Sequence, residues 1–274
     1  MSGIDPCNII GEVLGEPANQ MRNPVNADYQ CPFMNSRCKK SSQRIEGPYP
    51  VCSIFKTKVN AVENLIAVCP KRFLETTFIQ DIVDHCWTGS KPKNFDFVHE
   101  VKMGNVGVVD VVVAELDATK SQVLNFVSVE LQAIDITGTY EPAYSALLNG
   151  SSLSEKTTYG FNWANVRKRY ITQLVSKGFY HHQWGTRIAS VLQDHVFNYF
   201  QKQLQFDELE PSKSDIVFLV YKYTKSEVDG EFKYRLELDR VVGTSHSSLM
   251  MRALYSQPPP KEDFCNRILD KMNK

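Results

Sequence analysis

The pattern of apolar and polar residues between positions 95 and 134 predicts a block of three β-strands. The first strand runs from Phe95 to Met103, and a Gly104-Asn105 turn leads into the second, at 106–116. A polar turn follows, and then a third strand at 123–134. Side chains alternate between the two faces of a strand, so the third strand presents a polar face opposite an apolar one. This block predicts a sheet whose one face packs against a core.

Outside this block, apolar residues recur every three or four positions, which is the spacing of helices. This spacing predicts helices at 74–87, 140–150, 162–177 and 187–203. Two more strands are expected at 216–223 and 231–242, and a proline-rich linker at 256–261 precedes a short C-terminal helix. Strands and helices mixed in this way are typical of an α/β protein.

Asp110 lies alone in an otherwise apolar run, Val106-Gly-Val-Val-Asp110-Val-Val-Val-Ala114. A carboxylate buried without a partner is destabilising by several kcal/mol or more, so it requires a cation or hydrogen-bond donors. Glu130 follows on the third strand, with Gln132 on the same face. The two carboxylates predict a divalent metal, and Mg²⁺ held by such oxygens assists phosphodiester hydrolysis. Gln132 can hydrogen-bond the attacking water or the phosphate but carries no charge.

A third acidic residue, Glu100, is a candidate for the same site, and the hairpin loop decides its position. A three-residue loop places Glu100 opposite Asp110, whereas a two-residue loop places His99 there. The sequence leaves both alternatives open.

The segment 26–75 is rich in loops and contains Cys31, Cys38, Cys52 and Cys69. Four thiolates suit a tetrahedral zinc or a single iron, and a metal can stabilise a unit with so small a core. We therefore expect two parts in the chain: an N-terminal region at 1–75 with this metal site, and a larger core at 76–274. The remaining three cysteines lie in unrelated contexts.

Composition restricts the functional classes further. The formal net charge is zero, so any anion-binding surface depends on local charge. One such place is the stretch 155–187, which contains six Lys or Arg residues and one acidic residue. There is no apolar run near the ~18 residues of a membrane helix and no signal-peptide pattern, so we expect a cytoplasmic protein that does not bind membranes.

Several blocks, in the same order, resemble the NotI family of type II restriction endonucleases. The first block contains Cys31-Pro-Phe-Met-Asn-Ser-Arg-Cys38, Pro50-Val-Cys52 and Ala67-Val-Cys69-Pro. The second contains Val108-Val-Asp110-Val and Val129-Glu130-Leu-Gln132, and is similar to a PD-(D/E)XK nuclease motif with Gln in the usual Lys position. The third is Asn165-Val-Arg167-Lys168-Arg169-Tyr170. Together these blocks cover roughly residues 29–180.

The resemblance implies a restriction-endonuclease-like α/β core, with a central mixed β-sheet flanked by helices and a small loop-rich subdomain with four cysteines. It also implies a homodimer that cleaves double-stranded DNA at a palindrome with Mg²⁺. Asp110 and Glu130 would bind Mg²⁺, with Gln132 and Glu100 completing the catalytic set, and the four cysteines would bind iron or zinc.

DNA contacts are expected from the basic helix that follows. Arginine recognises guanine and Asn or Gln recognises adenine, whereas contacts to phosphate carry no sequence information. The candidates on this helix are Asn162, Asn165, Arg167, Lys168 and Arg169, and His181 and His182 lie further along it. Two other functions compete with a restriction endonuclease: a non-catalytic DNA-binding module with a cysteine-bound metal, and a non-specific or repair nuclease on the same fold.

Overall fold

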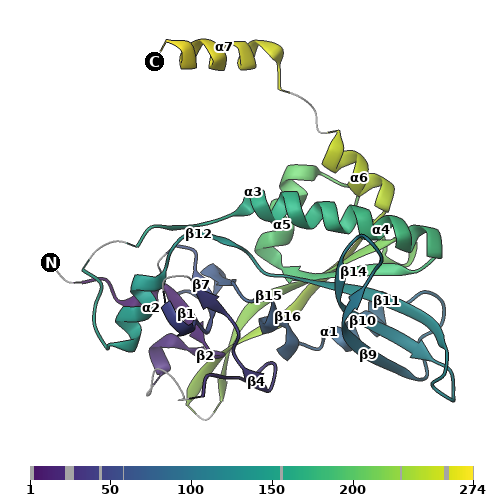
Figure 1. Ribbon diagram of the computed structural model, residues 1–274, viewed down its shortest axis with the longest axis horizontal. Coiled ribbons are helices and arrows are strands. Elements are labelled where there is room, and N and C mark those ends of the chain that lie inside the picture. Colours follow the sequence, from purple (N-terminus) through teal and green to yellow (C-terminus); the bar gives the residue numbers. More distant parts are fainter. Residues whose placement is uncertain are drawn as a thin grey trace.

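A central sheet of six strands organises the computed structural model, which describes residues 3–21, 28–42, 45–57, 59–154, 157–228, 230–255 and 259–273 (Figure 1). The strand order is β16-β15-β14-β11-β10-β9. The strands are β9 (Phe95–Lys102), β10 (Val108–Leu116), β11 (Val123–Gln132), β14 (Arg187–Gln193), β15 (Ile216–Val228) and β16 (Glu231–Thr244). The parallel pairs β11–β14 and β14–β15 lie between antiparallel ones, so the sheet is mixed.

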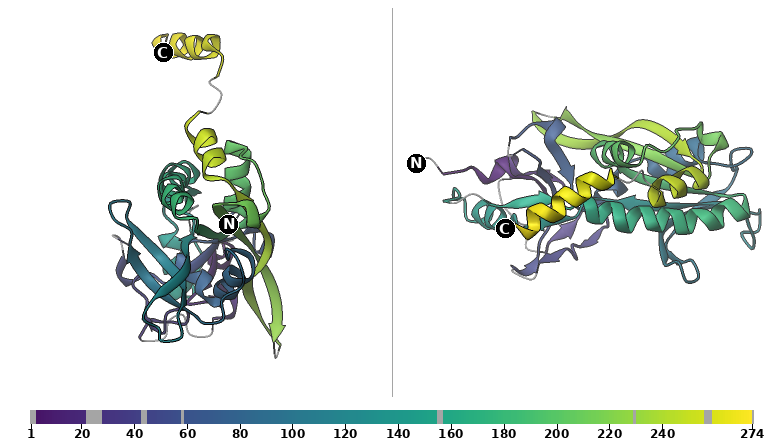
Figure 2. Two further views of the ribbon diagram at one scale, coloured as in Figure 1. Left: turned by 90° about the vertical axis from the view of Figure 1, so that its right-hand side faces the viewer. Right: turned by 90° about the horizontal axis from the view of Figure 1, so that it is seen from above.

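Helices cover both faces of this sheet, which confirms the predicted architecture (Figures 1 and 2). On one face, α1 (Phe78–His85) packs against the valines of β10 and β11. On the other face lie α4 (Thr172–Trp184), α5 (Asp194–Leu204) and α6 (His246–Leu254). Alternation along β14 serves both faces, since Ile188 and Leu192 belong to one apolar cluster and Ala189 and Val191 to the other.

The prediction of one helix over 187–203 is wrong in its first half. Residues 187–193 form β14, which is buried along its whole length, and only the second half is helical, as α5. A strand buried on both faces reads as a continuous apolar run, which sequence periodicity does not distinguish from a helix.

The basic helix is longer than predicted and has an irregularity near its start. It consists of α3 (Trp163–Val166), a π-helical turn at Arg167–Ile171 and α4. A π-turn inserts an extra residue, so the buried face of the helix after the turn is rotated relative to the buried face before it. The helix ends at Gly185, whose φ of 66° is left-handed, as is usual after a helix C-terminus.

A second sheet, of four strands, lies in the N-terminal region. Its order is β2-β1-β7-β8, with β1 (Ile10–Val13), β2 (Glu16–Pro17), β7 (Val51–Phe55) and β8 (Leu65–Ala67). Two-stranded ribbons accompany it: β3 (Gln30–Cys31) with β4 (Ser36–Arg37), β5 (Ser41–Ser42) with β6 (Ile45–Pro48), and β12 (Ile136–Gly138) with β13 (Tyr159–Phe161). The helix α2 (Glu141–Leu148) follows β12.

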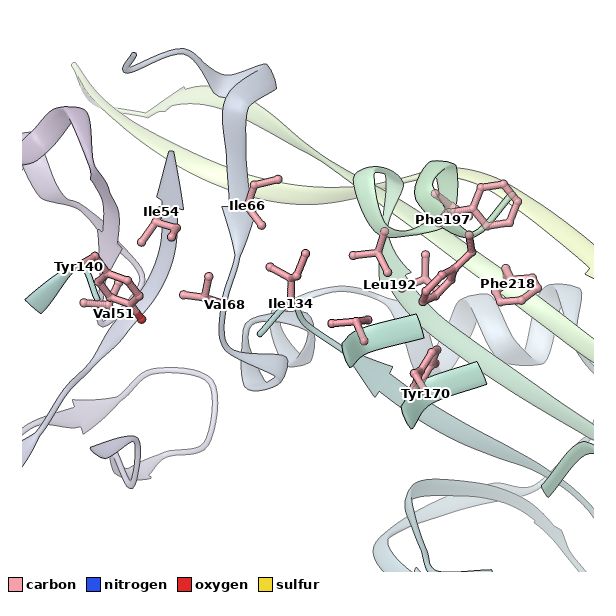
Figure 3. Close-up of a cluster of buried hydrophobic side chains, with 14 of the residues drawn as sticks. Val51, Ile54, Ile66, Val68, Ile134, Tyr140, Tyr170, Leu192, Phe197 and Phe218 are labelled. Atoms are coloured by element: carbon pink, nitrogen blue, oxygen red, sulfur yellow. The ribbon is translucent and has the colours of Figure 1, made fainter. Parts of the chain in front are cut away.

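Apolar packing connects the second sheet to the central one. Figure 3 shows Ile54, Ile66 and Val68 on one side, Ile134 between, and Leu192 with Phe197 on the other. All of these side chains are at least nine-tenths buried. The division expected at residue 75 stays a prediction, and one apolar cluster includes residues from both sides of it.

The C-terminal helix α7 (Lys261–Met272) is exposed along its whole length and stands apart from the rest of the chain (Figure 1). It confirms the predicted short helix, whereas α6 before it was not predicted. Of the expected linker, residues 256–258 lie outside the described residues.

Candidate active site

Asp110 and Glu130 come together where β10 and β11 leave their antiparallel ladder. The last pair of that ladder is Val111 with Val129, and Asp110 and Glu130 are the next residues on the two strands. The Asp110 carboxylate accepts a hydrogen bond of 2.8 Å from the backbone N–H of Leu131. Asp110 is half-buried, between the fully buried Val109 and Val111. The strand that carries the second carboxylate, β11, therefore provides the hydrogen-bond donor for Asp110.

Glu130 is the more deeply buried of the two acids, with 3% of its surface exposed. Burial raises the pKa of its carboxyl group to about 7, and the nearby charge of Asp110 acts in the same direction. Contact with the ammonium group of Lys177 opposes this rise. Two carboxylates this close are a place where a cation is strongly favoured.

Lys177 was not among the residues predicted from the sequence. It comes from α4, is 1% exposed, and its Nζ lies 2.5 Å from Glu130 Oε1 and 2.7 Å from the carbonyl oxygen of Val108. A signal for it exists in the sequence. Tyr170 and Leu174 mark the inner face of the basic helix, and Lys177 is the next residue on that face. A lysine there needs a buried partner, just as Asp110 does.

Gln132 lines a small pocket of about 130 Å³ between the end of β11 and the start of the basic helix. Its amide donates to the carbonyl of Ala133. The other polar side chains around this pocket are Asp135, Arg169 and Gln173. The pocket therefore joins the carboxylate strand to part of the predicted DNA-binding helix.

The strand register places Glu100 across from Asp110, because His99 pairs with Val111 and Val101 pairs with Val109. Glu100 has a left-handed backbone, with φ of 57°, and an exposed side chain. Non-glycine residues rarely adopt this conformation, and it interrupts the regular alternation of the strand. Glu100 thus lies opposite Asp110 in the strand register, at an irregular point of the edge strand, with its side chain exposed.

Four of the five predicted DNA-binding residues divide between two surfaces. Arg169 lines the pocket with Gln132, and Asn165 donates to the Asp135 carboxylate at 3.0 Å. Arg167 and Lys168 instead line a cleft beside α6.

The other side chains predicted to approach DNA are placed differently. The Asn162 side chain caps the helix start by accepting from the Asn165 N–H at 3.2 Å. His181, expected near a DNA groove, is completely buried, so that expectation is wrong, whereas His182 is exposed.

Two hairpins carry the four cysteines. Cys31 lies in β3 and Cys38 just after β4, whereas Cys52 lies in β7 and Cys69 follows β8. Burial raises the pKa of the Cys38 thiol, and the neighbouring Cys69 and Cys31 add to this. Burial likewise raises the pKa of the Cys52 thiol, and the nearby Glu12 and Cys69 act in the same direction. The thiols are neighbours, although in the described part of the chain no three or more His, Cys, Asp or Glu side chains are arranged to hold a metal ion.

Comparison with known protein families identifies the family to which the chain belongs. Residues 12–234 match the family described as restriction endonuclease NotI, which is most of the chain. The chain belongs to the NotI family of restriction endonucleases. The matched region contains the carboxylate pair, Lys177 and the four cysteines. No curated protein matches the chain.

As a member of the NotI family, the protein is an endonuclease whose substrate is DNA. The mixed sheet and the paired carboxylates at the ends of β10 and β11 agree with a nuclease core. Among the described residues, no helix has the length and apolar character needed to cross a bilayer.

Proposed function

We propose that this protein is a type II restriction endonuclease that hydrolyses both strands of DNA at a palindromic sequence with Mg²⁺, in the cytoplasm. The observation that carries the proposal is the pair Asp110 and Glu130 on adjacent strands, inside a chain of the NotI family. Two carboxylates supply hard oxygen ligands, the chemistry that Mg²⁺ requires, so the residues fit the ion.

In this proposal Asp110 and Glu130 would hold Mg²⁺, and Glu100 would support them from the edge strand. A bound Mg²⁺ would lower the pKa of a coordinated water and offset negative charge on the phosphate. The backbone N–H of Leu131 orients the Asp110 carboxylate. Gln132 would donate its amide N–H to a phosphate oxygen or accept a hydrogen bond from the attacking water.

The test is plasmid cleavage. We expect discrete fragments with Mg²⁺, and a fall of ~10³-fold or more in Asp110→Ala and in Glu130→Ala, because metal-assisted charge stabilisation contributes several kcal/mol. Glu115→Ala is the matched control, since Glu115 is a carboxylate further along β10. Discrete cutting that survives both substitutions would refute the assignment. A smear of fragments would favour a non-specific nuclease, and DNA binding without cleavage would favour a non-catalytic module.

For the cysteines, we propose a structural iron or zinc held by Cys31, Cys38, Cys52 and Cys69. Four thiols on two adjacent hairpins are a donor set that suits either metal. The ammonium group of Lys40 supports this, because its Nζ donates to the carbonyls of Val51 and Val68, each next to one of the thiols. A positive charge in that place stabilises thiolates.

Elemental analysis tests this site. We expect about one iron or zinc per chain and loss of that metal in Cys38→Ser, because a tetrahedral site needs all four ligands. Cys265→Ser, an exposed thiol on α7, is the control that should retain the metal. Purified protein without iron or zinc, or a Cys38→Ser variant that keeps its metal, would contradict the proposal.

DNA contacts are proposed for Asn162, Asn165, Arg167, Lys168 and Arg169. Support comes from local charge in a chain of zero net charge and from Arg169 beside Gln132. We also propose a homodimer, because two equivalent sites related by a two-fold axis match the symmetry of a palindrome.

A further inference from the structure

Lys177 is a buried cation at the carboxylate pair that belongs to no motif of the strands. Its side chain reaches from α4 to two points on the sheet: Glu130 Oε1 on β11 at 2.5 Å, and the carbonyl oxygen of Val108 on β10 at 2.7 Å. Val108 is two residues from Asp110 on the same strand. One ammonium group therefore ties together the two strand ends that carry the acids.

The packing of α4 against the sheet fixes the position of Lys177. On the inner face of α4, Leu174, Gly178 and His181 are buried along with it. Gly178 allows the helix to lie close to the sheet, because a Cβ there would be 3.0 Å from Ile216 Cδ1. Lysine is seldom buried this completely unless it is paired. The interaction is thus built into the packing of α4 on the sheet.

The contact between Lys177 and Glu130 also changes the charge balance of the site. Asp110, Glu130 and an incoming phosphate are all anionic, and Gln132 is neutral where the nuclease motif usually has Lys. We propose that Lys177 is a positioning residue of the active site: it fixes Glu130 against the backbone of β10 and supplies, from the helix, the positive charge that Gln132 does not provide. This inference rests on the proposed nuclease function.

A specific consequence for metal binding follows from this arrangement. The ammonium group attracts Glu130, but it also repels a divalent cation bound beside it. Removal of the charge should tighten the binding of a divalent metal while it slows cleavage. A lysine that only supported the fold would not give this combination, since its loss would loosen the site and so weaken metal binding while it slowed cleavage.

The experiment compares Lys177→Met, Lys177→Arg and the wild type in three measurements. Titration of DNA-free protein with Mn²⁺, followed by electron paramagnetic resonance, should show binding that is about tenfold tighter in Lys177→Met. The titration is done at a pH alkaline enough to keep the Glu130 carboxyl group ionised in every variant, because loss of the lysine raises its pKa further. At saturating Mg²⁺ the same variant should show kcat about 100-fold lower with little change in KM for DNA, as expected when charge stabilisation is lost. Lys177→Arg keeps the charge and should recover most of kcat.

Thermal denaturation accompanies each variant, and Lys177→Gln, which is uncharged but can still donate to Glu130, replaces Lys177→Met if that variant does not fold. Lys202→Met, an exposed lysine on α5, is the control and should match the wild type. Wild-type kcat in a folded neutral variant, or weaker Mn²⁺ binding in it, would overturn the role of Lys177. Failure of the wild type to cut DNA would instead overturn the nuclease proposal, and the Mn²⁺ titration is independent of that result.

Discussion

His181 is a fully buried histidine one helical turn after Lys177 on the inner face of α4. Its Nδ1 lies 2.8 Å from the Thr186 hydroxyl, and within the described structure its Nε2 has no hydrogen-bond partner. Burial lowers the pKa of the ring to about 4, and the charge of Lys177 acts in the same direction. The imidazole is therefore held neutral, packed against Phe126 and Trp184.

This neutral histidine predicts a loss of stability in acid. Because the pKa is lower in the folded chain than the usual 6.5, the unfolded chain binds the proton first, and stability falls as the pH drops from about 6.5 to 4. The shift corresponds to about 3 kcal/mol. Urea denaturation across this range should show that His181→Gln, which does not titrate, lacks that part of the decline. His85→Gln, at an exposed site on α1, should decline like the wild type; an equal decline in His181→Gln would contradict the explanation.

At the residue scale, a buried charged group could be predicted from the sequence where it interrupts a clear local pattern. Asp110 interrupts a run of valines, so its need for a partner was visible. Lys177 lies in a helix that already contains several basic residues, so its charge does not stand out in the sequence. Its spacing from Leu174 places it on the inner face of the helix, but its partner Glu130 lies on another element, and that contact is visible only in the folded structure.

At the scale of elements, a buried ion pair joins the N-terminal sheet to the long β15–β16 hairpin. Glu12 of β1 and Arg72 are both fully buried, and Arg72 Nη2 lies 3.0 Å from Glu12 Oε1. Glu12 also accepts from Ser53 of β7 at 2.7 Å and from Tyr223 of β15 at 3.0 Å, whereas Arg72 donates to the carbonyl of Tyr234 of β16 at 2.7 Å. Four strands thus meet at one pair of charges.

Breaking this pair should strongly destabilise the protein. Glu12→Ala leaves the Arg72 charge buried without its main partner, so we expect a loss of about 3–5 kcal/mol in the free energy of unfolding, measured by urea denaturation. The matched control is Lys233→Ala, which removes a surface pair with Glu16 between the same two regions and should change stability by less than about 1 kcal/mol. If Glu12→Ala proved no more destabilising than the control, the pair would not hold the elements together.

Helices and strands could be predicted from apolar spacing where one face is buried and the other is exposed to solvent. Strands β9, β10 and β11 and helices α1 and α2 lie where apolar spacing placed them, within a few residues, and the basic helix begins as predicted but extends further, to Trp184. The errors fall on β14, whose two faces are both buried, on α6, and on the four-stranded N-terminal sheet, which was expected to be a loop-rich unit. Sequence also failed to show that Glu12 is buried, because its partner Arg72 is 60 residues away along the chain. Such long-range pairs become visible only in the folded structure.

At the scale of the whole molecule, the protein must attract DNA without net charge, since 31 basic residues balance 31 acidic ones. Attraction then depends on where the charge lies, and the basic stretch at 155–187 follows the carboxylate strands directly. In the proposed function, each chain contributes the Asp110–Glu130 pair and cuts one strand. Cleavage of both strands at a palindrome then requires two chains.

Mixed dimers test this requirement. If each subunit cuts one strand, a dimer of wild type and Asp110→Ala should nick one strand and leave the other intact. An equal mixture that exchanges subunits freely contains about half mixed dimers, as expected for random pairing in a two-fold assembly. Supercoiled plasmid should then yield a large fraction of nicked circles, whereas wild type alone yields linear DNA.

Light scattering should first establish the dimer, with a mass of twice 31.2 kDa. The control mixture replaces Asp110→Ala with Glu115→Ala, which carries an intact carboxylate pair and should give linear product. Linear product from the Asp110→Ala mixture, after subunit exchange has been demonstrated with tagged chains, would mean that one active site cuts both strands in turn. A chain that cuts both strands at a mass of 31.2 kDa would contradict the dimer outright.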